Sequence, residues 1–148
     1  MRDAIISVFF GITGGIFAQV VKICIIDPSI RYSKLKVDIL INIQYFCDAI
    51  NTEMLNEYMK QKGRDRREKF LKLSAELYST HETFVWAFNW APKFIFQPVK
   101  KIMFGKDDIF KAVKALRGLS NTNDYSQAYS YTTRICIALN IDKDALEG

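Results

Sequence analysis

The longest apolar run of the chain lies near its N-terminus. Residues 4–26, AIISVFFGITGGIFAQVVKICII, carry a single charge, that of Lys22. A helix of this length rises about 35 Å, which is enough to cross a hydrocarbon core of about 30 Å with some tilt. The pattern therefore predicts an N-terminal transmembrane helix. A buried core helix and a cleaved or interfacial segment are the alternatives.

The charges on either side of this run differ. Arg31, Lys34 and Lys36 follow it closely, whereas only Arg2 precedes it, next to Asp3. Because basic residues are enriched on the cytosolic side, this asymmetry predicts a single-pass protein with its N-terminus outside and a cytosolic C-terminal domain.

One face of the predicted span is built from small residues. The residues on this face or bordering it are Ser7, Gly11, Gly14, Gly15, Ala18, Gln19 and Lys22. Small side chains let helices approach closely in lipid, so we expect a homo-oligomer assembled through this face. A water-lined pore containing Gln19 and Lys22 is a further hypothesis. A third is that the glycines reflect only the usual composition of membrane helices.

Helical periodicity continues through most of the remaining chain. Asp27-Pro28-Ser29 predicts a membrane-exit turn within residues 27–33. Four helices are expected after it, at about 32–62, 66–80, 107–119 and 124–139, with Gly63 ending the first and Asp124 or Asn123 capping the last. The predicted fold is all-α: one transmembrane helix, then a cytosolic bundle of four to five helices over residues 34–141, and a polar tail at 142–148.

Basic residues are concentrated around the start of the second of these helices. They are Lys60, Lys62, Arg64, Arg66, Arg67, Lys69 and Lys72, against only Asp65 and Glu68. Anionic lipid, RNA and plain solvent all remain open as what this surface faces. Arg66 also falls on the inner stripe of its helix, together with Phe70, Leu73 and Leu77, so it is a candidate for a buried pair.

Residues 82–105 are rich in aromatic side chains and interrupted by Pro92 and Pro98. Aromatic and lysine side chains together are typical of the lipid headgroup level. The candidate interface residues are Trp86, Trp90, Phe94, Phe96, Lys100 and Lys101. Packing onto the bundle, or a re-entrant element, would give the same pattern.

Little in the sequence points to catalysis or to a cofactor. His81 is the single histidine, and the three cysteines lack any CxxC pairing. We therefore expect no catalytic residue, no metal site and no cofactor, and cysteines that are buried free thiols in a reducing compartment.

Three short motifs carry a resemblance to known proteins. They are Asp27-Pro28, the stretch RREKFLKLSAEL that ends at Leu77, and Leu116-Arg117-Gly118-Leu119-Ser120-Asn121. In plan the chain resembles small bacterial single-span membrane proteins with a cytosolic helical domain, among them the HEPN-like accessory membrane proteins of type VI CRISPR systems. The resemblance implies a bacterial inner membrane location and an antiviral role through membrane disruption. The Arg-x(4–6)-His motif of HEPN ribonucleases is missing, because no histidine follows Arg67 at that spacing or follows Arg117 or Arg134.

Two functional hypotheses follow. In the first, the protein is a membrane-embedded oligomer that perturbs or permeabilises the bilayer, plausible as an antiviral defence effector. In the second, it is a membrane-tethered helical module that binds a protein partner, anionic lipid or RNA at the inner membrane face.

Overall fold

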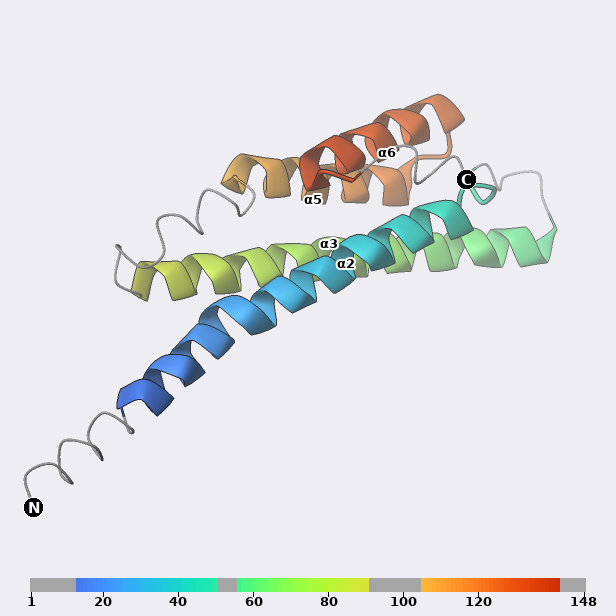
Figure 1. Ribbon diagram of the computed structural model, residues 1–148. Helices are drawn as coiled ribbons and strands as arrows, with labels where there is room; N and C mark the ends of the chain where they lie inside the picture. Colours follow the sequence, from blue (N-terminus) through green and yellow to red (C-terminus); the bar gives the residue numbers. More distant parts are fainter. Residues whose placement is uncertain (1–12, 51–55, 91–104, 142–148) are drawn as a thin grey trace, which may run out of the picture.

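The computed structural model describes residues 13–50, 56–90 and 105–141, and every element in these ranges is helical (Figure 1). This confirms the all-α prediction. The elements after residues 13–21, which are also helical, are η1 (Lys22–Ile26), α2 (Asp27–Tyr45), α3 (Glu57–Trp90), α5 (Lys106–Asn121) and α6 (Tyr125–Leu139).

The exit turn predicted for residues 27–33 is wrong, because the chain is helical without interruption from 13 to 45. Pro28 occupies the first turn of α2, where its fixed φ fits a helix. The π-helical turn η1 stands immediately before it, and the N–H of Asp27 bonds to the carbonyl of Lys22. This widened turn adjusts the hydrogen-bond ladder at the position where proline supplies no N–H.

Helix α3 is the centre of the bundle. It packs against α2 and against α5, which in turn packs against α6, and η1 also contacts α3. The core consists of side chains from all four long helices, including Ile39, Phe70, Leu77, Leu116 and Ile135. In Figure 1, residues 13–26 form the end of the N-terminal helix that extends away from the α5–α6 pair.

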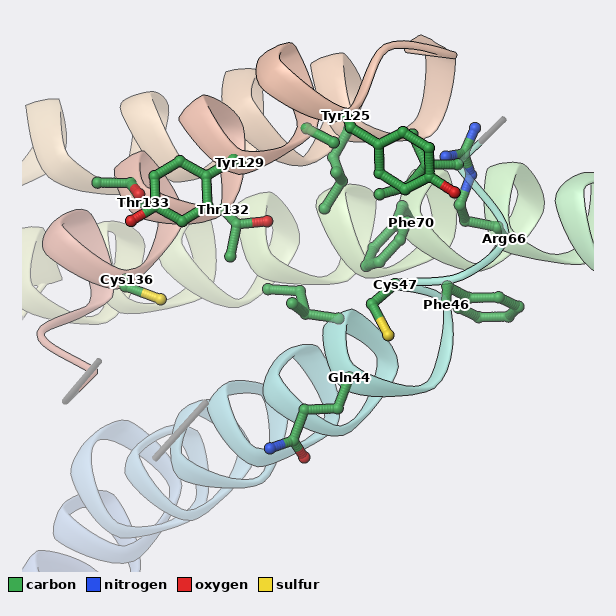
Figure 2. A pocket seen from close by; sticks show the side chains of 14 residues that line it. Gln44, Phe46, Cys47, Arg66, Phe70, Tyr125, Tyr129, Thr132, Thr133 and Cys136 are labelled. Atoms are coloured by element: carbon green, nitrogen blue, oxygen red, sulfur yellow. The ribbon is translucent and has the colours of Figure 1, made fainter. Parts of the chain in front are cut away.

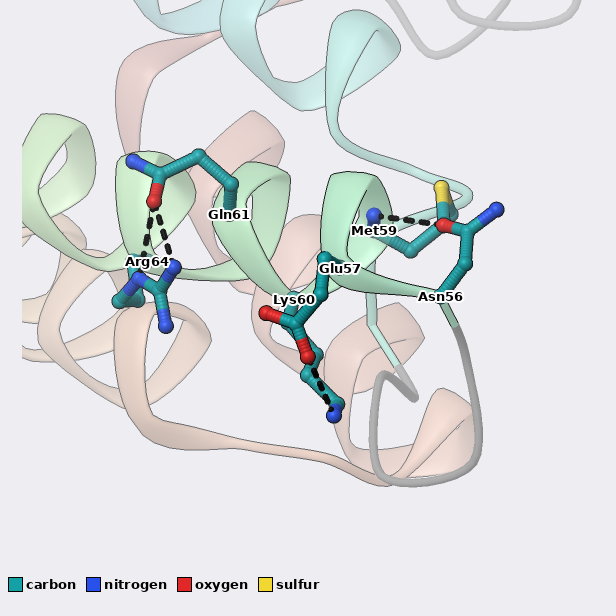
Figure 3. Close-up of polar contacts among 6 residues, drawn as sticks. All are labelled: Asn56, Glu57, Met59, Lys60, Gln61 and Arg64. Carbon is teal, nitrogen blue, oxygen red and sulfur yellow. Dashed lines mark hydrogen bonds and ion pairs between the residues drawn. The ribbon is translucent and has the colours of Figure 1, made fainter.

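The break predicted at Gly63, between the helices expected at 32–62 and 66–80, is misplaced. Helix α2 ends at Tyr45, and α3 then runs through Gly63. A glycine inside a helix costs about 1 kcal/mol relative to alanine, which is too little to end a 34-residue helix that packs on two neighbours. The start of α3 has its own signal, because the Asn56 side chain accepts a hydrogen bond from the N–H of Met59 at 3.1 Å (Figure 3).

The last two helices lie where the pattern placed them. The Asp124 carboxylate caps α6 by accepting from the N–H of Ser126 at 2.8 Å, which confirms the predicted cap. On these helices Ile109 and Leu116 are buried, whereas Phe110 and Tyr125 are exposed. The two helices approach closely at Gly118, where an added Cβ would lie 2.5 Å from the Tyr131 ring.

Part of the predicted span and of the aromatic segment falls outside the described residues. Residues 4–12 belong to this part, as do 91–104 and the tail 142–148. Within the ranges that are described, no helix is both long enough and apolar enough to cross a membrane.

Candidate functional site

Three of the predicted surface cations are engaged in local contacts on α3. Lys60 pairs with Glu57 at 2.9 Å, and the Arg64 guanidinium donates to the Gln61 side-chain oxygen at 2.6 and 3.0 Å (Figure 3). Lys62 reaches back to the turn after α2, where it pairs with Asp48 at 2.8 Å and lies 4.5 Å from the centre of the Tyr45 ring.

The Lys62–Asp48 contact also affects titration. The hydrogen bond from Lys62 lowers the pKa of the Asp48 carboxyl, and the same bond raises the pKa of Lys62. Most of the Lys62 side chain is covered, but Asp48 is exposed to solvent, which screens the pair and limits its contribution to stability. The pair nevertheless joins the end of α2 to α3.

The remaining cations of the predicted basic surface divide into two groups. Arg67, Lys69 and Lys72 are exposed, and no ion pair with them is found among the described residues. Arg66 does not belong to the surface at all, because only 4% of it is exposed. Its predicted place on the inner stripe of the helix is confirmed, and its place in a solvent-facing patch is wrong.

The Arg66 guanidinium has one hydrogen-bond acceptor within the described structure. Its Nη2 donates to the backbone carbonyl of Thr122, at the C-terminal end of α5, over 2.7 Å. This bond ties α3 to the connection between α5 and α6. Nη1 and Nε are buried and have no hydrogen-bond partner among the described residues.

The electrostatic surroundings of Arg66 are unfavourable. Burial, followed by the like charge of Arg67, lowers the pKa of the guanidinium below its ordinary value. No carboxylate among the described residues pairs with it, so the buried pair expected from the sequence is not found there. Arginine nevertheless keeps its proton at neutral pH, because its ordinary pKa lies far above neutrality. The bundle therefore contains a buried positive charge.

A pocket of about 670 Å³ lies next to this charge (Figure 2). It is formed by the end of α2 and the turn that follows, by α3, and by one face of α6, and Leu119 of α5 completes its wall. Its lining consists of Ile43, Gln44, Phe46, Cys47, Ile50, Arg66, Phe70, Leu119, Tyr125, Ala128, Tyr129, Thr132, Thr133 and Cys136. Most of these side chains are apolar, and the volume is typical of small-molecule sites.

Polar groups in the pocket come mainly from α6. Tyr125, Tyr129, Thr132 and Thr133 supply hydroxyl groups, and Figure 2 shows the Tyr125 hydroxyl directed toward the end of the pocket where Arg66 lies. This pocket was not among the sites predicted from the sequence. A usable signal was present, since hydroxyl-bearing residues recur at positions i, i+4, i+7 and i+8 along the helix face that begins at Tyr125.

The cysteines only partly match the expectation of buried thiols. Cys136 is a buried thiol in the pocket wall, whereas Cys47 is an exposed free thiol. The side chain of Cys24 is not among those described.

The small-residue face is described from residue 13 onward, so Ser7 and Gly11 lie outside the described residues. Gly14, Gly15, Ala18, Gln19 and Lys22 are all exposed. A Cβ added to Gly14 or Gly15 would meet no atom of the described structure within 4 Å. The face is therefore open to contacts from outside the described fold.

Among the candidate membrane-interface residues, Trp86 has a described side chain. It lies on the last turns of α3 and is 65% exposed. Trp90 ends the same helix, and its side chain is not described. Phe94, Phe96, Lys100 and Lys101 lie outside the described residues.

His81, the single histidine of the sequence, lies within α3. Its ring makes an edge contact with Phe110, with the ring centres 6.4 Å apart. The described residues bring together no group of three or more His, Cys, Asp or Glu side chains that could hold a metal ion.

Comparison with protein-family models, with curated proteins and with solved structures finds no match to this chain.

Proposed function

We propose that this protein is a helical module tethered to a membrane by residues 4–26, with its bundle held at the inner face. The observation that carries the proposal is the exposure of the helix over residues 13–26. Its large apolar side chains are between 42% and 60% exposed at Ile16, Phe17, Val20, Ile23 and Ile26. Apolar surface of this extent needs a cover that the described fold does not supply.

The same helix behaves differently after Pro28. In α2 the stripe of Leu35, Ile39 and Ile43 is buried against the bundle, as in an ordinary amphipathic helix. Over residues 13–26 the described side chains are exposed or half-buried and none is buried, whereas α2 is buried along one side. This change supports two environments along one continuous helix. Lipid suits the first environment, because the apolar run continues from residue 13 back to residue 4.

The exposed cations Arg67, Lys69 and Lys72 support the inner face as the place of the bundle. Each basic residue near an anionic membrane surface contributes about 1 kcal/mol of attraction. On this proposal the protein binds a partner at the membrane, where anionic lipid, RNA and protein remain candidates for its basic surface.

Extraction of cell membranes tests the tether. Wild-type protein should stay in the membrane pellet after washing at high pH, whereas Ile16→Lys combined with Phe17→Lys should move it to the supernatant. Each lysine near the middle of a span costs about 2.5–3.5 kcal/mol of insertion.

The matched control is Val37→Lys combined with Ile41→Lys. These two residues are equally exposed, at 55% and 54%, but lie beyond the proposed span, so this variant should remain in the pellet. Wild-type protein in the supernatant would contradict the tether, as would release by the control variant alone.

A second candidate function is an oligomer that perturbs or permeabilises the bilayer. The open face at Gly14, Gly15 and Ala18 favours it, because small residues let helices pack closely in lipid. On this proposal the protein acts as a defence effector of the kind that the resemblance implies. Its test is the glycine substitution argued in the Discussion.

A further inference from the structure

We propose that the pocket between α2, α3 and α6 binds a small amphiphile with a single negative charge, and that Arg66 binds the anionic group. The site lies inside the bundle, so the proposal holds whether or not residues 4–26 enter a membrane. Three features of the described structure carry it: a buried cation with unused donors, the lack of a carboxylate beside it, and an apolar cavity that adjoins it.

The first feature is the hydrogen-bonding state of Arg66. Only Nη2 has an acceptor, while Nε and Nη1 are buried and unpartnered within the described residues. Leaving buried donors unsatisfied is unfavourable, and more so on a charged group. Nε and Nη1 lie on different edges of the guanidinium, each beside Nη2, which carries two N–H groups and uses one of them for Thr122. One of the two edges therefore still offers the pair of N–H groups that a carboxylate or phosphate group fits.

The second feature is the charge around the pocket. On α3, the charge of Arg67 acts on Arg66, and it has the same sign. Asp48, on the turn after α2, is already paired with Lys62. On α6 the Asp124 carboxylate accepts from Ser126. None of the described acidic groups neutralises the positive charge of Arg66. On this proposal the bound anion neutralises it.

The third feature is the cavity itself. Apolar side chains from three elements, such as Ile43, Phe70 and Ala128, line a volume of about 670 Å³ that continues from Arg66. An apolar tail can be buried there, while the hydroxyls of Tyr125 and Thr132 are available to the polar end. A site that is mostly apolar with a few convergent polar groups is typical of ligand pockets.

The number of charges decides the class of ligand. One guanidinium balances one negative charge, and a dianion such as a phosphate monoester would leave a second charge buried without compensation. The fitting groups are therefore a carboxylate or a phosphodiester attached to an apolar body. Nε and Nη1 have no contact with solvent in the described structure, so the proposal requires the guanidinium to turn toward the cavity when the anion binds.

Photolabelling of the full-length protein tests this site. The probe is a medium-chain fatty acid that carries a diazirine on its chain, added to purified protein with phosphatidylcholine vesicles. Mass spectrometry then locates the labelled residues. We expect labelling within 125–136 and 43–50, and at least about tenfold less with the methyl ester of the same probe, which lacks the charge.

Variants separate binding by Arg66 from simple partition into an apolar cavity. Arg66→Gln should reduce labelling of residues 125–136 by at least about tenfold, and Arg66→Lys should retain part of it, since the charge remains but the fork is lost. Arg117→Gln removes an exposed arginine on α5 and should change nothing. Thr132→Trp fills the cavity, leaves Arg66 in place, and should abolish labelling even if Arg66→Gln fails to fold.

Two competitors distinguish the source of the anion. Displacement of the probe by vesicles that contain phosphatidylglycerol identifies a lipid phosphodiester, whereas displacement by decanoate alone identifies a free carboxylate; either result supports the site. Equal labelling by the acid and its methyl ester would overturn the proposal. So would undiminished labelling of a helical Arg66→Gln or Thr132→Trp variant, or failure of both competitors. Labelling of residues 13–26 would come from probe dissolved in the vesicles. It tests the membrane tether and not the pocket.

Discussion

At the scale of single residues, Arg66 combines a structural hydrogen bond with an incomplete set of partners. Its bond to the Thr122 carbonyl joins α3 to the end of α5. The two donors left without acceptors in the described structure offset what that bond contributes. A side chain selected only for stability would be expected to satisfy all its donors or to be apolar, and this argues that Arg66 is present for binding.

Replacing Arg66 with methionine should change the free energy of unfolding only slightly. The substitution leaves the Thr122 carbonyl unpaired, but it also removes a buried charge and fills the space with a flexible apolar chain. The two effects oppose each other, so the free energy of unfolding should stay within about 1 kcal/mol of wild type. Urea unfolding of the full chain, followed by circular dichroism, measures it.

Phe70→Ala is the matched control for this measurement. Phe70 lies one turn further along α3 and is 1% exposed, and its truncation should lower the free energy of unfolding by about 3–5 kcal/mol. A loss of that size in Arg66→Met would mean that Arg66 is chiefly structural.

At the scale of elements, the sequence predicted helix type and burial better than helix ends. The predicted inner stripe that includes Phe70, Leu73 and Leu77 is buried, and the cap at Asp124 is formed, because both depend on residues close together in the chain. The breaks assigned to Pro28 and Gly63 are wrong. Pro28 stands in the first turn of α2, where its missing N–H and fixed φ are tolerated, and the packing of α3 on α2 and α5 keeps the chain helical through Gly63.

The pocket was beyond prediction from the sequence for a different reason. It depends on residues from α2, α3 and α6 that are far apart in the chain. Periodicity placed Arg66 on an inner face, but it could not show that the facing groups would be a backbone carbonyl and an apolar cavity instead of a carboxylate.

A substitution in the N-terminal helix tests whether the protein assembles through its small-residue face. Gly15→Ile adds a branched side chain on the open small-residue face, so an oligomer packed through that face should be lost. Apolarity rises, and membrane extraction should not change. Native mass spectrometry of detergent-solubilised protein and dye release from vesicles should report smaller assemblies and less leakage.

Phe17→Ile is the control for this substitution, because Phe17 lies on the opposite side of the helix from Gly15 at helical spacing. It should leave both assembly and leakage unchanged. If Gly15→Ile keeps the wild-type assembly, the oligomer, where one exists, does not form through this face.

At the scale of the whole molecule, one continuous helix links the proposed membrane segment to the pocket. It runs through residues 13–45, and Ile43 and Gln44 near its end belong to the pocket lining. At about 1.5 Å per residue, Ile43 lies about 26 Å along the helix axis from Ile26. The pocket is therefore held at a fixed distance along this helix from the proposed bilayer surface, which suits a ligand that has left the membrane or comes from the aqueous side.

The orientation of the molecule can be tested through its exposed thiol. Cys47 is free and exposed beside the pocket, whereas Cys136 is buried. Because Arg31 and Lys34 are exposed just after the proposed span, the positive-inside rule places Cys47 in the cytosol. A membrane-impermeant maleimide should therefore spare Cys47 in intact spheroplasts and label it after lysis.

In a Cys47→Ser background, Arg2→Cys should be labelled in intact spheroplasts, since the N-terminus then faces outward. Labelling of Cys47 before lysis, with protection of Arg2→Cys, would reverse the orientation and put the Arg66 pocket outside the cell.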